Sequence, residues 1–272
     1  MDWRILSALI LVFATMSASL CLEEEENSTP PLEGPWSDMI GLKQELNSLS
    51  SLPVKYVDST EDAGEISEPS KTLYVLPGLD SPLTGKEVLS LKSYVEAGGH
   101  LILADDSNMT EHLVRAFGIY LWAMPYRPGW RYTDDWVYNL SFIKAVGELE
   151  GVNFTVLVHK PMGVNLTGEG AIMLSLPHYA TIELNGDGKE SLGDAFFSVA
   201  PVAVEVRSEG GGTMLFVSSS GLFTDNVFDS YDNRAFLRAY FASILPGGGR
   251  VYFDDTKQLF GISPHNVILK GA

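Results

Sequence analysis

A single crossover unit, residues 72–106, constrains the fold more than any other part of the chain. Its two apolar runs, Thr72–Leu76 and Leu101–Ala104, have the composition of short strands that are buried on both faces of a sheet. A strand, a helix and a second strand in this order place the two strands in parallel, with a right-handed connection between them. The sequence therefore predicts an α/β domain built on a mainly parallel sheet.

The helix of this unit carries its own start and stop signals. Thr84 and Glu87 form a capping box, in which each side chain accepts a hydrogen bond from a free backbone N–H group. Gly98 and Gly99 follow the helical pattern, at the place where a helix commonly ends on a left-handed residue. A helix is therefore expected over Thr84–Ala97.

The same α/β pattern occurs on both sides of this unit. The further elements that the sequence predicts are a helix at 37–49, a strand at Val54–Val57, a helix at 110–117, a strand at Thr213–Val217, a helix from Asp232 to Leu245 and a strand at Arg250–Phe253. Asp232 is expected to cap the helix that it begins. We assign the α/β domain to residues 36–118 and 208–260.

Residues 119–207 interrupt this pattern. They contain few long amphipathic helices and several apolar runs that are typical of strands: Phe154–Val158, Ala171–Leu176, Ala180–Leu184 and Val202–Val206. We interpret the segment as a β-rich insertion that forms a layer of its own. Residues 261–272, after the last predicted strand, are assigned to a C-terminal tail.

The first 22 residues have the profile of a targeting segment. Arg4 precedes an uncharged apolar run, Ile5–Leu22, and Glu23–Glu26 follow it directly. This order fits a signal peptide that is removed on export. It fits an uncleaved membrane anchor equally well, since a run of about 18 residues is at the lower limit for a membrane-spanning helix. Residues 23–35 are acidic and contain proline, so they predict a flexible tether.

Five acceptor triplets for N-glycosylation support an address outside the membrane. They begin at Asn27, Asn108, Asn139, Asn153 and Asn165. One such triplet arises easily by chance, whereas five in an exported chain indicate a glycosylated surface protein. We therefore expect an extracytoplasmic protein, secreted or held at the cell membrane by its N-terminal segment.

The net charge and the cysteine content exclude several classes of function. The formal net charge of −17 at pH 7 would be repelled by nucleic acid and by an anionic membrane surface. Cys21 is the one cysteine of the chain, and it lies in the targeting segment. The folded part therefore offers neither an intramolecular disulfide nor a catalytic thiol.

Two segments resemble a known family. GKEVLSLKSYVEAGGHLILADD contains the motif Val95–Gly99, and GGTMLFVSSSGLFTDNVFDSYDNRAFLRAYFASIL contains Asp232–Arg234. Together with Gly41–Leu49, these segments are similar to the domain-of-unknown-function family numbered 4350. The resemblance implies a class I glutamine amidotransferase-like fold, a flavodoxin-like three-layer sandwich, and export or membrane tethering. It covers most of the chain after the targeting segment except roughly residues 119–207.

The loops that follow the predicted strands contain a candidate ligand site. In open α/β sheets, ligands bind beyond the carboxyl ends of the strands. The polar residues expected at this edge are Asp80, Asp105, Asp106, Ser219, Ser220 and Asp254. Gathered carboxylates would suit calcium or magnesium, but aspartates after strands also cap the next helix, which is the simpler interpretation. The metal at this edge, if any, is left open, and no cofactor is expected.

A serine hydrolase is an alternative interpretation of the same edge. Ser218–Ser220, Asp254 or Asp255, and His265 follow the Ser, Asp, His order of hydrolases with a nucleophile elbow. Val217, however, stands where the elbow motif has its first glycine, and a serine-rich turn commonly hydrogen-bonds its own backbone. We therefore favour a non-catalytic site.

Two further groups of residues are candidates for binding. Asp232, Asn233 and Arg234 could bind an anion at a helix N-terminus, or could serve the fold alone. Trp122, Trp130 and Trp136 lie in an aromatic segment that could contact a protein or a glycan, or could be buried against the sheet.

These observations lead to one main hypothesis and two alternatives. The main hypothesis is an exported, membrane-tethered, non-catalytic domain that binds an extracytoplasmic protein or a small ligand, with a membrane transport or protease complex among the candidate partners. The alternatives are an extracytoplasmic hydrolase with a carboxylate or serine site at the strand ends, and a glycan-binding surface protein.

Overall fold

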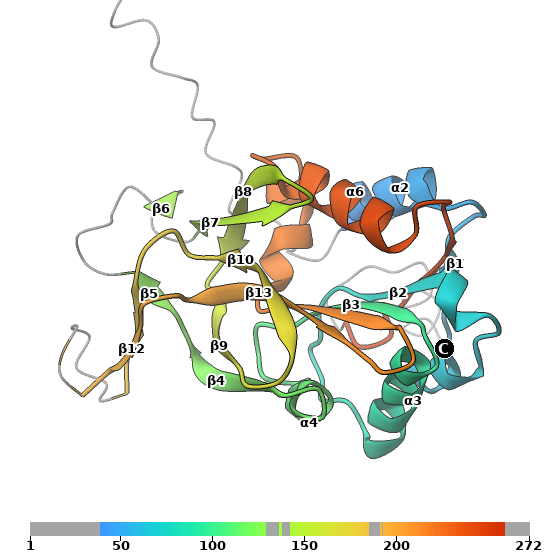
Figure 1. The fold of residues 1–272 in the computed structure, drawn as a ribbon, viewed down its shortest axis with the longest axis horizontal. Helices are drawn as coiled ribbons and strands as arrows, with labels where there is room; N and C mark the ends of the chain where they lie inside the picture. The colour runs from blue at the N-terminus through green and yellow to red at the C-terminus, as the bar shows by residue number, and fades with distance from the viewer. Residues whose placement is uncertain (1–38, 129–135, 138–141, 185–190, 192, 259–272) are drawn as a thin grey trace, which may run out of the picture. The chain divides into compact units, whose positions relative to one another are not determined.

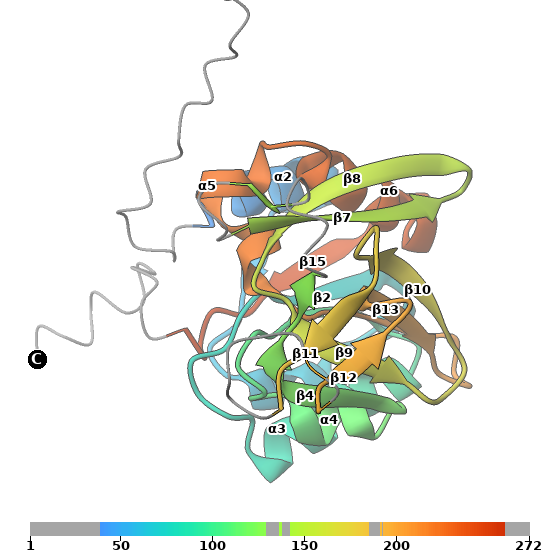
Figure 2. The ribbon, with the colours of Figure 1, turned by 90° about the vertical axis from the view of Figure 1, so that its left-hand side faces the viewer.

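A computed structural model describes residues 39–128, 136–137, 142–184, 191 and 193–258. Its main sheet has the order β1 (Lys55–Tyr56), β15 (Arg250–Phe253), β2 (Thr72–Leu76), β3 (His100–Ala104), β14 (Thr213–Val217), β13 (Pro201–Arg207), β10 (Gly170–Ser175), β7 (Phe142–Leu149) and β6 (Trp136–Val137). β8 (Val152–His159) pairs with β7. Figures 1 and 2 show this sheet from two sides.

The centre of the sheet is parallel. β1, β15, β2, β3 and β14 run in the same direction, and Ile102 of β3 lies opposite Val75 of β2 and Leu215 of β14. Every residue of β2, β3 and β14 is buried. The predicted mixed α/β fold with parallel central strands is therefore confirmed.

Helices cover both faces of these strands (Figure 1). One face is covered by α3 (Gly85–Glu96), α4 (Glu111–Arg115) and the 3₁₀ turn η1 (Thr60–Glu65), and the other by α2 (Ile40–Leu49), α5 (Asp225–Phe228) and α6 (Asn233–Ile244). Shorter 3₁₀ turns are η2 (Pro69–Lys71) and η4 (Ser220–Phe223). Alternate residues of each strand therefore enter two different cores.

We predicted that residues 119–207 form a separate β-rich layer, and this is wrong for several of their strands. β13 runs antiparallel along β14, with Ala203 opposite Val217, so it continues the main sheet, and β10 and β7 extend it further. The reason is that β14 would otherwise be an apolar edge strand with unpaired backbone groups. Smaller sheets pair β4 (Ile119–Pro125) with β9 (Met162–Leu166), and join β12 (Ala195–Phe197), β11 (Ala180–Ile182) and β5 (Arg127–Pro128).

The backbone at the end of α3 is in direct contact with the backbone of the turn before β14. The Thr84–Glu87 capping box is present at the start of α3, and Gly98 follows its end with a left-handed φ of 99°. A Cβ atom on Gly210 would lie 1.8 Å from the carbonyl oxygen of Glu96, and one on Gly212 would lie 2.0 Å from that of Val95. Only glycine allows this approach.

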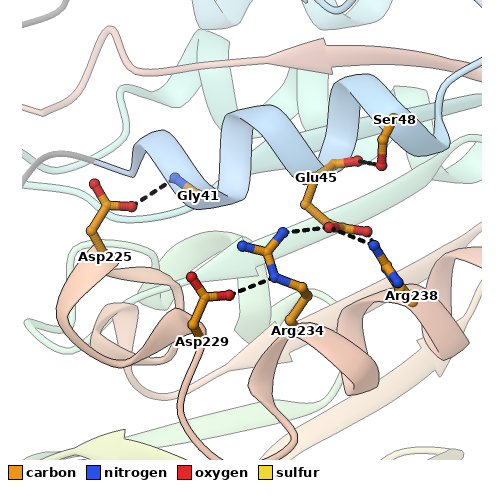
Figure 3. A network of polar contacts seen from close by, with 7 residues as sticks. All are labelled: Gly41, Glu45, Ser48, Asp225, Asp229, Arg234 and Arg238. Atoms are coloured by element: carbon orange, nitrogen blue, oxygen red, sulfur yellow. Dashed lines mark hydrogen bonds and ion pairs between the residues drawn. The ribbon is translucent and has the colours of Figure 1, made fainter.

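A buried carboxylate joins α2 to α6 (Figure 3). Glu45 of α2 is 2% exposed and accepts hydrogen bonds from Arg234 and Arg238 of α6. Burial alone would raise the pKa of Glu45, but the hydrogen bonds and charges of the two arginines lower it below its usual value. Glu45 therefore stays ionised inside the helix–helix contact.

The N-terminus of α2 is capped by a residue far away in the sequence. Asp225 of α5 accepts hydrogen bonds from the N–H groups of Ile40, at 3.0 Å, and Gly41, at 2.7 Å. Met39, at the N-cap position of α2, provides no side-chain cap. A carboxylate at this position satisfies free donors and interacts well with the helix dipole.

We predict that Glu45→Gln lowers the free energy of unfolding by about 1–3 kcal/mol, because Arg234 and Arg238 both lose the negative charge with which they pair. Urea denaturation followed by circular dichroism would measure the change. Glu96→Gln is the matched control, since Glu96 pairs with Lys92 on the surface and such pairs contribute about 0–1 kcal/mol. Equal stabilities of the two variants would contradict the role of Glu45.

Candidate functional site

The carboxyl ends of β2, β3, β14 and β15 lie along one edge of the sheet, because these strands are parallel. We call the loops that follow them, residues 77–83, 105–110, 218–224 and 254–258, the strand-end rim. The loop after β3 leads to α4 on one face, and the loop after β14 leads to α5 and α6 on the other. This is the topological switch point at which open α/β sheets commonly bind ligands.

Asp105 is used by the fold. It is fully buried, and its Oδ1 accepts hydrogen bonds from the N–H and hydroxyl groups of Ser107. Its Oδ2 accepts two more, both at 2.7 Å, from the N–H and hydroxyl groups of Thr110. Asp105 thus orders the loop that leads into α4, and both of its oxygens are occupied.

Asp254 has an equivalent role after β15. It is fully buried, and its Oδ1 accepts hydrogen bonds from the N–H and hydroxyl groups of Thr256. Its Oδ2 accepts from the Tyr74 hydroxyl at 2.7 Å and from the Thr60 hydroxyl at 2.6 Å. The carboxylate ties β15 to β2 and to η1.

The serine turn is not built as a nucleophile elbow. Ser219 is fully buried, its hydroxyl donates to the carbonyl oxygen of His159 at 2.8 Å, and it accepts from the N–H of the same residue at 3.1 Å. The hydroxyl proton is thus directed at a carbonyl and not at a general base. The Ser218 hydroxyl is also buried, without a hydrogen-bond partner in the described part of the chain. His265 lies outside the described residues.

Asp106 and Ser220 are more accessible than the buried Asp105, Ser219 and Asp254. The Ser220 hydroxyl donates to Asp106 Oδ2 at 2.6 Å, which joins the loops on either side of the switch point. Partial burial of the carboxylate, with the nearby charges of Asp105 and Asp80, raises the pKa of Asp106. Gly78 lies against this pair, since a Cβ atom there would be 3.2 Å from Cβ of Ser220.

The remaining rim contacts join the loops to one another. The N–H of Asp80 donates to the carbonyl oxygen of Lys257 at 2.9 Å, and Lys257 Nζ pairs with Glu87 of α3 at 2.7 Å. Within the residues that the structure describes, no group of three His, Cys, Asp or Glu side chains is placed to hold a metal ion. The rim therefore brings the predicted residues to one edge, but most of their polar atoms bond to the protein itself.

The Asp232-Asn233-Arg234 motif connects α6 to β8 and α2. Asn233 is fully buried; its Oδ1 accepts from the N–H of Leu157, and its Nδ2 donates to the carbonyl oxygens of Leu157 and Leu222. Arg234 pairs with Glu45 and Asp229, as its structural interpretation predicts. The Asn233 amide has no free group for an anion.

Asp232 is at the N-cap position of α6, as predicted, but the predicted capping by its side chain is wrong. Its side chain makes no capping bond to α6 and accepts instead from the N–H of Thr155 in β8, at 2.8 Å. The N–H of Asp232 donates to the carbonyl oxygen of Thr155, so the residue pairs with the strand in both directions. Bonds to the neighbouring strand have displaced the local cap.

His159 lies beside the serine turn. Burial and, to a smaller extent, the charge of Lys160 lower its pKa to about 4, so the imidazole is neutral at pH 7. Its ring packs against Phe142, with 5.3 Å between the ring centres.

The aromatic candidates are only partly described. Trp122 is half-buried and packs edge-on against Phe197, with 5.9 Å between the ring centres, so it contributes to packing. Trp130 and the side chain of Trp136 lie outside the described residues.

Two of the glycosylation candidates are exposed. Asn153 and Asn165 lie on the surface of β8 and β9. Asn108 is half-buried and its amide donates to Glu111 at 3.3 Å. Asn27 and Asn139 lie outside the described residues.

We predict that Asn233→Ala lowers the free energy of unfolding by about 2–4 kcal/mol, because it leaves three buried backbone groups without partners. Asp232→Asn is the matched control, since it retains an acceptor for the N–H of Thr155 and should cost less than about 1 kcal/mol. Urea denaturation would measure both values. An Asn233→Ala protein as stable as the unaltered one would show that the motif serves something other than the fold.

Solved structures show the fold that this chain shares. The N-terminal domain of mmIFT52 is similar with a TM-score of 0.55 and 16% identity, over 77% of this chain and 90% of that one. Parts of two larger proteins are more distant: an exo-β-1,4-mannosidase from Opitutaceae bacterium strain TAV5, with a TM-score of 0.39 and 13% identity over 66% of this chain and 26% of that one, and an α-L-fucosidase from Paenibacillus thiaminolyticus, with a TM-score of 0.39 and 12% identity over 69% and 28%. The likeness to the mmIFT52 domain concerns the fold alone.

Sequence comparison identifies the family. No curated protein sequence matches the chain. Residues 42–241, which include most of α2, the crossover unit, three of the four rim loops and most of α6, match the family described as Domain of unknown function (DUF4350). Because this match spans well over half of its length, the chain belongs to the DUF4350 family.

Proposed function

We propose that the chain is an exported domain, tethered to the membrane by its N-terminal segment, that binds a protein or a small ligand outside the membrane without catalysing a reaction. We further propose that its fold is a three-layer sandwich of the class I glutamine amidotransferase-like type. The helices on both faces of the parallel strands support this architecture.

The use of the rim residues by the fold is the observation that carries the non-catalytic proposal. Ser219 bonds to the backbone of His159 in both directions, and the two buried aspartates, Asp105 and Asp254, have both oxygens occupied. A nucleophile needs a hydroxyl or thiol beside a general base, and Ser219 lacks that arrangement. A rim of fixed geometry is suited to recognition, because little has to be ordered on binding.

The Asp106–Ser220 pair favours one rival function, a hydrolase. Its hydrogen bond of 2.6 Å places a carboxylate of raised pKa beside a half-buried hydroxyl at the switch point. A carboxylate in this position could remove the hydroxyl proton as a general base.

An activity screen separates the two functions. We expect the purified full-length protein to give no turnover of model ester, amide and phosphate substrates above that of the Ser220→Ala and Asp106→Asn variants. Ser107→Ala is the control, since Ser107 bonds to Asp105 in the next part of the rim. Turnover that is lost in Ser220→Ala or Asp106→Asn and retained in Ser107→Ala would establish the hydrolase.

The proposed location outside the membrane is tested separately, in cells. The described residues contain no helix with the length and apolarity to cross a bilayer, so the proposal of a tether depends on the N-terminal segment. We expect the native protein in the membrane fraction, and we expect protease added to intact cells to digest it. A cytoplasmic enzyme provides the control for cell integrity. Recovery of the protein with that control, protected from the protease, would refute the proposed address.

A further inference from the structure

A groove lies along the β1 edge of the main sheet, away from the strand-end rim. It encloses about 450 Å³ between β1, β15 and η1. Tyr252 of β15 lines it and is 5% exposed, and Tyr56 of β1 and Val57, the next residue, extend the lining. The volume is in the range of sites that bind small molecules.

The charges of the groove are separated by the element that carries them. Lys55 and Arg250 come from the two strands, whereas Asp62 and Glu65 come from η1 and Asp58 follows β1. The groove thus has a basic wall on the sheet and an acidic wall on the 3₁₀ turn. A ligand lying across it would meet both signs of charge.

These charges do not neutralise one another. Within the described part of the chain, neither Lys55 nor Arg250 forms an ion pair, although three carboxylates line the same groove. Nearby charges behave differently: Lys71 and Glu68, just before β2, pair at 2.6 Å. The two walls therefore present open charges to the solvent between them.

Tyr252 holds the basic wall in place. Arg250 Nη1 donates to the Tyr252 hydroxyl at 3.5 Å, and Lys55 Nζ lies 5.3 Å from the centre of the same ring. A cation near an aromatic face is attracted to it without being neutralised. Both cations are thus positioned by a nearly buried ring and remain available to a carboxylate.

We propose that this groove binds a small zwitterion of the α-amino acid class, free or as a short peptide. Its carboxylate pairs with Arg250 and Lys55, and its ammonium group pairs with Asp62 and Glu65. A ligand with a single charge would be attracted by one wall of the groove and repelled by the other. This site is separate from the strand-end rim and does not depend on the function proposed for it.

Calorimetric titration of the full-length protein with glycylglycine tests the proposal. We expect a dissociation constant on the order of 0.1–1 mM, since the charges are exposed and such pairs are individually weak. Acetate and methylammonium, which carry the two charges separately, should bind at least about tenfold more weakly. Binding of either ion as tightly as glycylglycine, or no heat with glycylglycine at about 10 mM, would overturn the proposal.

Matched variants locate the site. Arg250→Gln and Asp62→Asn should each weaken glycylglycine binding by about tenfold, which corresponds to one lost charge interaction. Lys86→Gln and Glu61→Gln remove charges of the same signs from positions outside the groove lining and should leave binding unchanged. All four side chains are exposed, so the variants should fold, and circular dichroism would verify this. Equal binding by all four variants would rule out the groove.

Discussion

The central parallel strands have two apolar faces, and both must be covered at once. Alternate residues of β2 enter opposite cores, with Leu73 and Val75 on the α2/α6 face and Tyr74 and Leu76 on the α3 face. Neither helical layer could be lost without exposing half of each strand to water. The Glu45 contact and the Asp225 cap matter for this reason, because they join α2 to α6 and to α5 within one covering layer.

The covering helices also determine which residues are needed in the loops at the carboxyl ends of the strands. β2, β3 and β14 leave the sheet there and turn toward a helix, so backbone groups that no strand partner satisfies collect at this edge. Asp105, Asp254 and Ser219 satisfy them. The residues that suggest chemistry in the sequence are therefore largely the same ones that the loops need, whereas Asp106 and Ser220 bond to each other nearer the surface.

The sequence predictions are accurate where the interacting residues are close together in the sequence, and they fail where these residues are far apart. The crossover unit was predictable because Thr84, Glu87 and Gly98 act within one helix. The partners of Asn233 were not, since Leu157 lies 76 residues away and no local pattern marks the pairing. Glu45 had a weak signal, because it stands beside Leu42 and Leu46 on the buried side of its helix. The groove had none, since its charges come from three elements that only the fold brings together.

The contact between α3 and the turn before β14 fixes where the chain returns to the parallel strands after the long segment from β4 to β13. Because Gly210 and Gly212 meet carbonyl groups of α3 directly, this contact does not depend on the side chains of the segment from β4 to β13. The place where the chain re-enters the parallel strands is thus set by backbone atoms. The strands β8 and β13 of the returning segment can then lie in register against α6 and β14.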